Sequence, residues 1–127
     1  MSKRKPVVYI ASPYSKGDPA INTHFQCRIF DQLLTENLVI PVAPLWTHFQ
    51  HLLYPRPYED WIRYDQETLF MYDICLRLEA VNQRTDYREY QSSGADAEVN
   101  SFRNCGKPVF FSIEDLYVWV RQNWGQS

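Results

Sequence analysis

The segment Ser92-Ser-Gly-Ala-Asp-Ala-Glu98 gathers residue types that can act on a small ligand. Gly94 lets the backbone come close to a ligand because it carries no Cβ. Ser92 and Ser93 supply hydroxyl groups and a helix cap. Glu98 is expected about one turn into the helix, with its side chain directed back toward the N-terminal end. The helix dipole also favours a carboxylate there by roughly 0.3–1 kcal/mol, so this segment alone leaves catalysis and helix stabilisation equally open.

A second polar segment, Tyr9-Ile-Ala-Ser-Pro-Tyr-Ser15, leads from a strand-like run into a turn. Its backbone amides, with Ser12, Ser15 and Lys16, could hold a phosphate or a sugar hydroxyl. The adjoining Pro13 and Tyr14 are further candidate binding residues. The spacing matches neither the P-loop nor the dinucleotide-binding glycine pattern. The plainer interpretation is a helix start stabilised by ordinary turn residues.

Three further positions are candidates on residue type alone. Asp73 precedes a third strand-like run, where a carboxylate could serve a site or simply face water. Trp61 belongs to an aromatic-rich segment that could stack on a nucleobase, at about 1–3 kcal/mol per stacked base, or could form core or oligomer contacts. His48 and His51 have the helical spacing of a metal pair, but no third ligand is evident, and we expect no metal site.

The elements that must position these residues alternate between strand and helix. Apolar, β-branched runs favour strands, and helical spacing of apolar residues favours helices. Pro41 removes a ladder donor, so an edge position or an irregularity is expected there. Residues 44–57 are rich in Pro and aromatics and are hard to assign. The pattern predicts strands at 7–11, 38–42, 73–81 and 108–112, and helices at 19–37, 58–72, 92–104 and 113–123.

This alternation predicts an α/β fold with a parallel sheet and helices on both faces. In such sheets ligands bind beyond the carboxyl ends of the strands. The third strand-like run is more polar than a buried central strand should be, because it contains Arg77 and Glu79. The long polar segment 82–91 that follows is either a lid or specificity element, or a solvated insertion.

Composition narrows the function classes. The 127 residues fit one domain, and a 45% hydrophobic content is enough for a real core. A formal net charge of −2 argues against nucleic acid polymers and anionic membranes as partners but leaves a free nucleotide possible. No apolar stretch is long enough to span a membrane. The three widely spaced cysteines, Cys27, Cys75 and Cys105, argue against a disulfide framework and fit a reducing cytoplasm.

Several short motifs occur together and in order along nearly the whole chain. They are Val8-Tyr-Ile-Ala-Ser-Pro-Tyr14, Trp61-x-x-x-Asp65, Asp73 before a strand, Ser92-x-Gly94-Ala95-x-x-Glu98 and Gly106-Lys-Pro-Val109. In this combination the chain resembles the nucleoside 2-deoxyribosyltransferase superfamily. That superfamily includes nucleoside 5′-monophosphate N-glycosidases and small bacterial and phage relatives.

The resemblance implies a flavodoxin-like or Rossmann-like three-layer sandwich with a parallel sheet of four to five strands. It also implies a homodimer or higher homo-oligomer with sites near subunit contacts. Glu98 would match the catalytic glutamate and Tyr9 the strand tyrosine that orients it. Asp73 would match an aspartate that relays a proton near the base. Ser92 would bind ribose or phosphate, and His48 would be a polar group at the mouth of the site.

This chemistry has a simple rationale. Breaking a C1′–N bond builds positive charge on the sugar, which an ionised carboxylate stabilises or attacks. The leaving base needs a proton, which a second carboxylic acid with a raised pKa can give. We therefore expect Glu98 to be the nucleophile and Asp73 the general acid, with no metal or organic cofactor. Transfer, hydrolysis and a non-catalytic nucleotide-binding or sensing role all remain open. A flavodoxin-like flavin protein is disfavoured, because the sequence has no Ser/Thr-rich phosphate loop after the first strand.

Overall fold

The computed structural model describes residues 4–11, 19–78 and 93–124. Each strand except β2 is followed along the chain by a helix that packs back on the sheet, as expected for parallel strands. The elements are β1 (Val7–Ala11), α1 (Pro19–Glu36), β2 (Ile40–Val42), α2 (Leu45–Leu53), α3 (Tyr58–Thr68), the 3₁₀ helix η1 (Leu69–Met71), β3 (Ile74–Arg77), α4 (Ser93–Asn104), β4 (Val109–Phe110) and α5 (Ile113–Asn123).

Within the described residues the strands form one four-stranded parallel sheet in the order β2-β1-β3-β4. The predicted α/β class with a parallel sheet is therefore confirmed. β1 is central and pairs Tyr9 with Val42 on one side and with Cys75 on the other. Pro41 lies in β2, an edge strand, as its missing N–H donor predicted.

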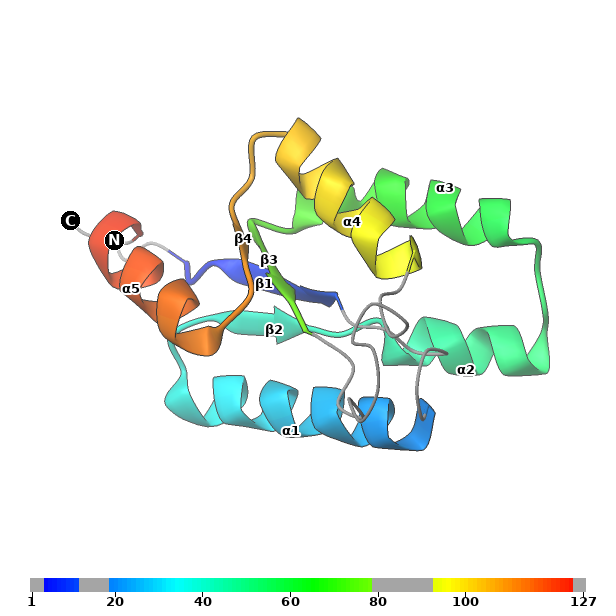
Figure 1. Ribbon diagram of the computed structural model, residues 1–127, viewed down its shortest axis with the longest axis horizontal. Coiled ribbons are helices and arrows are strands. Elements are labelled where there is room, and N and C mark those ends of the chain that lie inside the picture. Colours follow the sequence, from blue (N-terminus) through cyan, green and yellow to red (C-terminus); the bar gives the residue numbers. More distant parts are fainter. Residues whose placement is uncertain (1–3, 12–18, 79–92, 125–127) are drawn as a thin grey trace, which may run out of the picture.

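The two faces of the sheet carry separate apolar clusters. Alternate residues of β1 and β3 face opposite sides, because successive strand side chains point in opposite directions. Val8 and Ile10 join the cluster that includes residues of α1 and α5, whereas Tyr9 and Ala11 join the cluster with Val99 and Phe102 of α4. Figure 1 shows α1 below the sheet and α3 and α4 above it. The sheet is thus the middle of three layers, and Tyr9 points into the layer formed by α3 and α4.

The predicted boundaries shift in places for local reasons. Helix α1 ends where Asn37 adopts a left-handed conformation with φ of 60°, and β2 starts at Ile40 rather than at residue 38. The predicted helix 58–72 closes in the tighter turn η1. The hard-to-assign segment contains α2, whose bounding prolines lie outside the helix. The loop 82–91 lies outside the described residues. In the part of the chain that the structure describes, no helix combines the length and apolarity needed to cross a membrane.

Candidate functional site

Tyr9 and Glu98 meet on the face of the sheet covered by α3 and α4. The Tyr9 hydroxyl donates a hydrogen bond to Oε2 of Glu98. Tyr9 is in the middle of the central strand β1 and only 4% exposed, so its ring is firmly placed. Glu98 lies in the second turn of α4, close to where the sequence predicted it. The predicted pairing of these two residues is thus present in the structure.

A second carboxylate, Asp65 of α3, completes the contact. The Asp65 and Glu98 side chains are hydrogen-bonded to each other, which requires a proton on one of the two carboxyl groups. Asp65 appears in the Trp61-x-x-x-Asp65 motif, but sequence reasoning gave it no role. A usable signal was present: Asp65 falls on the same helical stripe as Ile62 and Leu69, where an apolar residue would be expected.

The environment favours the protonated forms of both carboxyl groups. Glu98 is half-buried as a residue, but its carboxyl group is enclosed; burial and the negative charge of Asp65 raise its pKa from 4.5 to about 8. The Tyr9 hydrogen bond and the positive charge of Arg77 oppose this rise. Burial likewise raises the pKa of Asp65, while its hydrogen bond with Glu98 acts against the rise. The raised pKa of Glu98 keeps a proton on the pair near neutral pH.

Aromatic rings form the inner wall beside the pair. The ring centroids of Tyr9 and Tyr72 are 4.8 Å apart, and that of Phe102 lies 5.8 Å from Tyr9 and 6.2 Å from Tyr72. Burial, followed by the charge of Glu98, raises the pKa of Tyr9 well above its usual range. Tyr9 therefore stays a hydroxyl donor at any physiological pH.

The carboxyl pair opens into a pocket between α3, α4 and β1. Its empty space amounts to about 370 Å³, including the mouth toward solvent. Apolar and aromatic side chains dominate its wall, and the polar groups converge on one side, as is typical of ligand sites. The lining residues are Tyr9, Ile62, Asp65, Gln66, Leu69, Tyr72, Ala97, Glu98, Ser101 and Phe102.

Strand β3 places two further groups on the same face. Cys75 pairs with Tyr9 across the sheet and is fully buried; burial and the charge of Glu98 raise its pKa to about 12. Arg77, two residues on, is only 5% exposed. The polar residue that looked out of place in a central strand is thus a buried cation whose field reaches Glu98.

Asp73 does not have the properties predicted for the general acid. It lies at the amino end of β3 and is not among the residues that line the pocket. Its carboxylate accepts hydrogen bonds from Arg4 at 2.6 and 3.1 Å and from the N–H of Val7 at 2.8 Å. Burial acts to raise its pKa, but these hydrogen bonds and the charges of Arg4 and Lys107 outweigh burial and lower it. The expected raised pKa is wrong, because Asp73 is held as an ionised partner.

Trp61 also lies outside the pocket wall. Its Nε1–H donates to Nδ1 of His51 over 2.8 Å, and its ring makes edge contacts with His51 and Tyr64. Trp61 therefore joins α3 to α2, which favours the packing interpretation over stacking on a base. Among the described residues no group of three or more potential ligands could hold a metal ion.

The remaining predicted binding residues are only partly covered by the structure. Gly94 lies in the first turn of α4, and His48 lies in α2, with side-chain placement outside the described part. Ser12, Pro13, Tyr14 and Ser92 lie outside the described residues. Their binding roles stay predictions.

No protein-family model matches this chain, and no curated protein or solved structure shows significant similarity to it. The family resemblance drawn from the motifs thus stays a prediction.

Proposed function

We propose that this protein cleaves or transfers at the N-glycosidic bond of a deoxynucleoside, a nucleoside or a nucleoside monophosphate. The observation that carries the proposal is the Asp65–Glu98 carboxyl pair, hydrogen-bonded to Tyr9 and opening into an aromatic-walled pocket. Glycosidic cleavage needs one ionised carboxylate and one carboxylic acid close to the same bond. This pair supplies both with a single shared proton.

The division of roles follows from the surroundings of each carboxyl group. Glu98 accepts the hydrogen bond of Tyr9 and lies in the field of Arg77, and both interactions favour its ionised form. Burial dominates at Asp65 and raises its pKa, and its hydrogen bond with Glu98 is the interaction that opposes this rise. The raised pKa of Glu98 places the shared proton mainly on Glu98 near neutral pH. The proposed reactive form is the less populated one, with the proton on Asp65 and the negative charge on Glu98, which the Tyr9 hydrogen bond and Arg77 stabilise. The acid role expected for Asp73 accordingly passes to Asp65.

The reaction can then be written with these groups. An oxygen of Glu98 attacks the sugar C1′ as the C1′–N bond breaks, and Asp65 gives its proton to the departing base nitrogen. This leaves a glycosyl ester on Glu98 and an ionised Asp65. Water or a second base then attacks C1′ and loses a proton to Asp65, which restores the starting state. Attack by water is hydrolysis, and attack by a base is transfer.

The direct test is a panel of deoxynucleosides, ribonucleosides and their 5′-monophosphates, with and without a second free base, followed by chromatography of the bases. Base release without an acceptor identifies a hydrolase, and exchange only with an acceptor identifies a transferase. Glu98→Gln and Asp65→Asn are both expected to abolish turnover. Glu67→Gln is the matched control, since Glu67 is on the same helix as Asp65 with a side chain 69% exposed.

Two results would contradict the proposal. Ligand binding without turnover of any panel member would indicate a non-catalytic binding or sensing module. Full activity in Glu98→Gln would place the nucleophile elsewhere. Mass spectrometry of the protein quenched during turnover adds an independent check, because a glycosyl group should be found on the peptide that contains Glu98.

A further inference from the structure

Tyr72 connects the pocket to a polar network at the amino ends of the strands. It lies at the joint between η1 and β3, and its buried ring packs against Tyr9 and Phe102. Tyr72 is also one of the residues that line the pocket. Any displacement of this joint would therefore move a side chain that touches Tyr9, which in turn holds Glu98.

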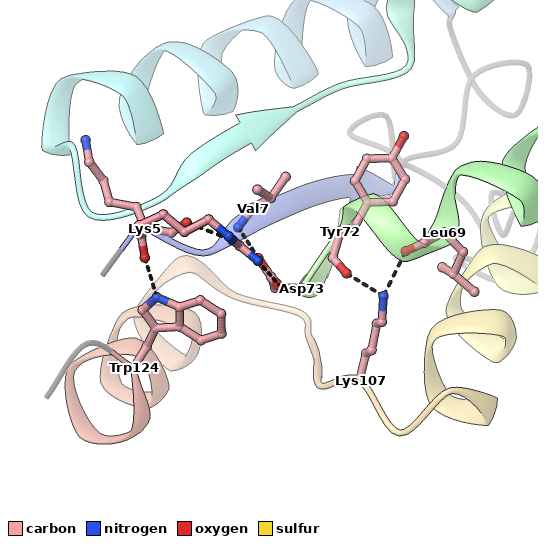
Figure 2. A network of polar contacts seen from close by, with 8 residues as sticks. Lys5, Val7, Leu69, Tyr72, Asp73, Lys107 and Trp124 are labelled. Atoms are coloured by element: carbon pink, nitrogen blue, oxygen red, sulfur yellow. Dashed lines mark hydrogen bonds and ion pairs between the residues drawn. The ribbon is translucent and has the colours of Figure 1, made fainter. Parts of the chain in front are cut away.

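The backbone of the joint is held from several directions. Nζ of Lys107 donates to the carbonyls of Leu69 and Tyr72 over 2.8 and 2.6 Å. The N–H of Asp73 donates to the carbonyl of Val7 over 2.8 Å, and its carboxylate accepts from the N–H of Val7. Figure 2 shows Lys107 reaching the joint from one side while Asp73 meets Val7 on the other. The Asp73 carboxylate also accepts from the Arg4 guanidinium.

Lys107 suits this position in both charge and placement. The last carbonyls of a helical turn carry partial negative charge, which an ammonium group stabilises. Gly106 has φ of 74°, a left-handed conformation common just past the end of a helix, and its N–H donates to the carbonyl of Arg103. The N–H of Lys107 then donates to the carbonyl of Phe102 over 2.9 Å. The turn that fixes Lys107 therefore also contacts the residue whose ring stacks on Tyr72.

We propose that Lys107 and Asp73 are positioning residues that hold the η1–β3 joint, and thereby fix the Tyr72 ring against Tyr9 and the Glu98 carboxylate. This role would account for Asp73 and the Gly106-Lys107 pair as features of the sequence without placing either in contact with substrate. Lys107 acts through two carbonyls of the joint, and Asp73 acts through both backbone groups of Val7. The effect of this positioning role on turnover rests on the proposed function, whereas its effect on the placement of the Tyr72 ring does not.

The structural part is tested by NMR on protein with labelled tyrosine rings and glutamate carboxyl groups. Lys107→Met keeps the length of the stem and removes the ammonium group. We expect the ring signals of Tyr72 and Tyr9 to shift and the titration of Glu98 to move, with Lys107→Arg intermediate. Lys5→Met is the matched control. Lys5 lies just before β1 at the same end of the sheet, but its ammonium group donates to Asn37 after α1 and not to the η1–β3 joint. Unchanged ring signals in Lys107→Met would overturn the proposal.

The catalytic consequence is tested with Asp73→Asn, which also serves if Lys107→Met does not fold. The asparagine can still accept from Val7 but loses the charge that pairs with Arg4. We expect kcat to fall on the order of tenfold, as for a small misplacement of reacting groups, with the shape of the pH profile kept. Loss of one limb of that profile would make Asp73 the acid and overturn the positioning role. If no substrate is turned over by the wild type, the proposed function fails, while the ring signals still decide this inference.

Discussion

The hydroxyl of Tyr9 donates to the carboxylate of Glu98 and so connects the central strand of the sheet to α4. β1 has a hydrogen-bonded neighbour on each side, and the Tyr9 ring is packed against Tyr72 and Phe102. The donor is therefore pre-organised before any ligand arrives. Because the bond favours the ionised form of Glu98, it works against burial and against the nearby charge of Asp65.

Tyr9→Phe should raise the pKa of Glu98 further, because the ionised carboxylate loses its donor. Each unit of increase lowers the ionised fraction about tenfold at pH values below the pKa. Activity near neutral pH should fall and recover partly as the pH is raised, which a pH profile of kcat/KM would show. The free energy of unfolding should fall by about 1–3 kcal/mol, because a buried acceptor loses its partner.

Tyr117→Phe is the control for this variant. Tyr117 is also buried and donates to a carboxylate, that of Glu36, but it belongs to the apolar cluster on the opposite face of the sheet. Denaturant unfolding should show a comparable loss of stability, with the pH profile unchanged. An equal shift of the pH profile in both variants would mean that the Tyr9 result reflects general destabilisation.

Tyr9 and Glu98 were predicted as partners through the ordered set of motifs and the family resemblance that this set suggests. The Glu98 segment alone left catalysis and helix stabilisation equally open. The alternation of strands and helices likewise predicted the parallel sheet, because hydrophobic periodicity reports which face of an element is buried. Those parts of the fold depend on short-range sequence information.

The choice between Asp65 and Asp73 could not be made in this way. The two carboxylates lie eight positions apart, and which one reaches Glu98 depends on the rotation of α3 and on a partner far away in the sequence. Arg4 is 69 positions from Asp73 and binds it at the amino ends of the strands. The bonded pair of Trp61 and His51 depends in the same way on how α2 packs on α3. Contacts of this kind are set by tertiary packing, which periodicity does not encode.

Glu98 should make the stability of the protein fall as the pH rises. Its pKa is 4.5 in ordinary surroundings and about 8 in the fold, so between these values the folded state binds the proton that the unfolded state has lost. The stabilising contribution is complete below about pH 4.5 and is lost as the pH rises through about 8. Glu98→Gln removes this titration, and its unfolding temperature should vary less across the window. Parallel pH dependence in wild type and Glu98→Gln would contradict the raised pKa.

The charge of Arg77 in β3 should lower the pKa of Glu98. This charge cannot be titrated away and favours ionised Glu98, so Arg77→Met should raise the pKa of Glu98 above about 8. Arg77→Lys keeps the charge and should restore much of the original value. Carbon-detected NMR titration of the Glu98 carboxyl measures this without any substrate. Arg103→Met is the control, since Arg103 is exposed and lies over the ring of Phe111; an equal shift there would rule out a specific effect of Arg77.

The reactivity of Cys75 measures whether the α3–α4 layer stays packed on the sheet. Cys27 and Cys105 are exposed, whereas Cys75 is fully buried with its pKa raised to about 12, first by burial and then by the charge of Glu98. Thiolates rather than thiols react with disulfide reagents, so Cys75 lacks both access and the reactive form. At pH 8 the native protein should consume reagent at Cys27 and Cys105 only, with Cys75 reacting at the rate of unfolding. Peptide mapping after brief labelling would identify the thiols, and rapid native labelling of Cys75 would show that the α3–α4 layer opens without global unfolding.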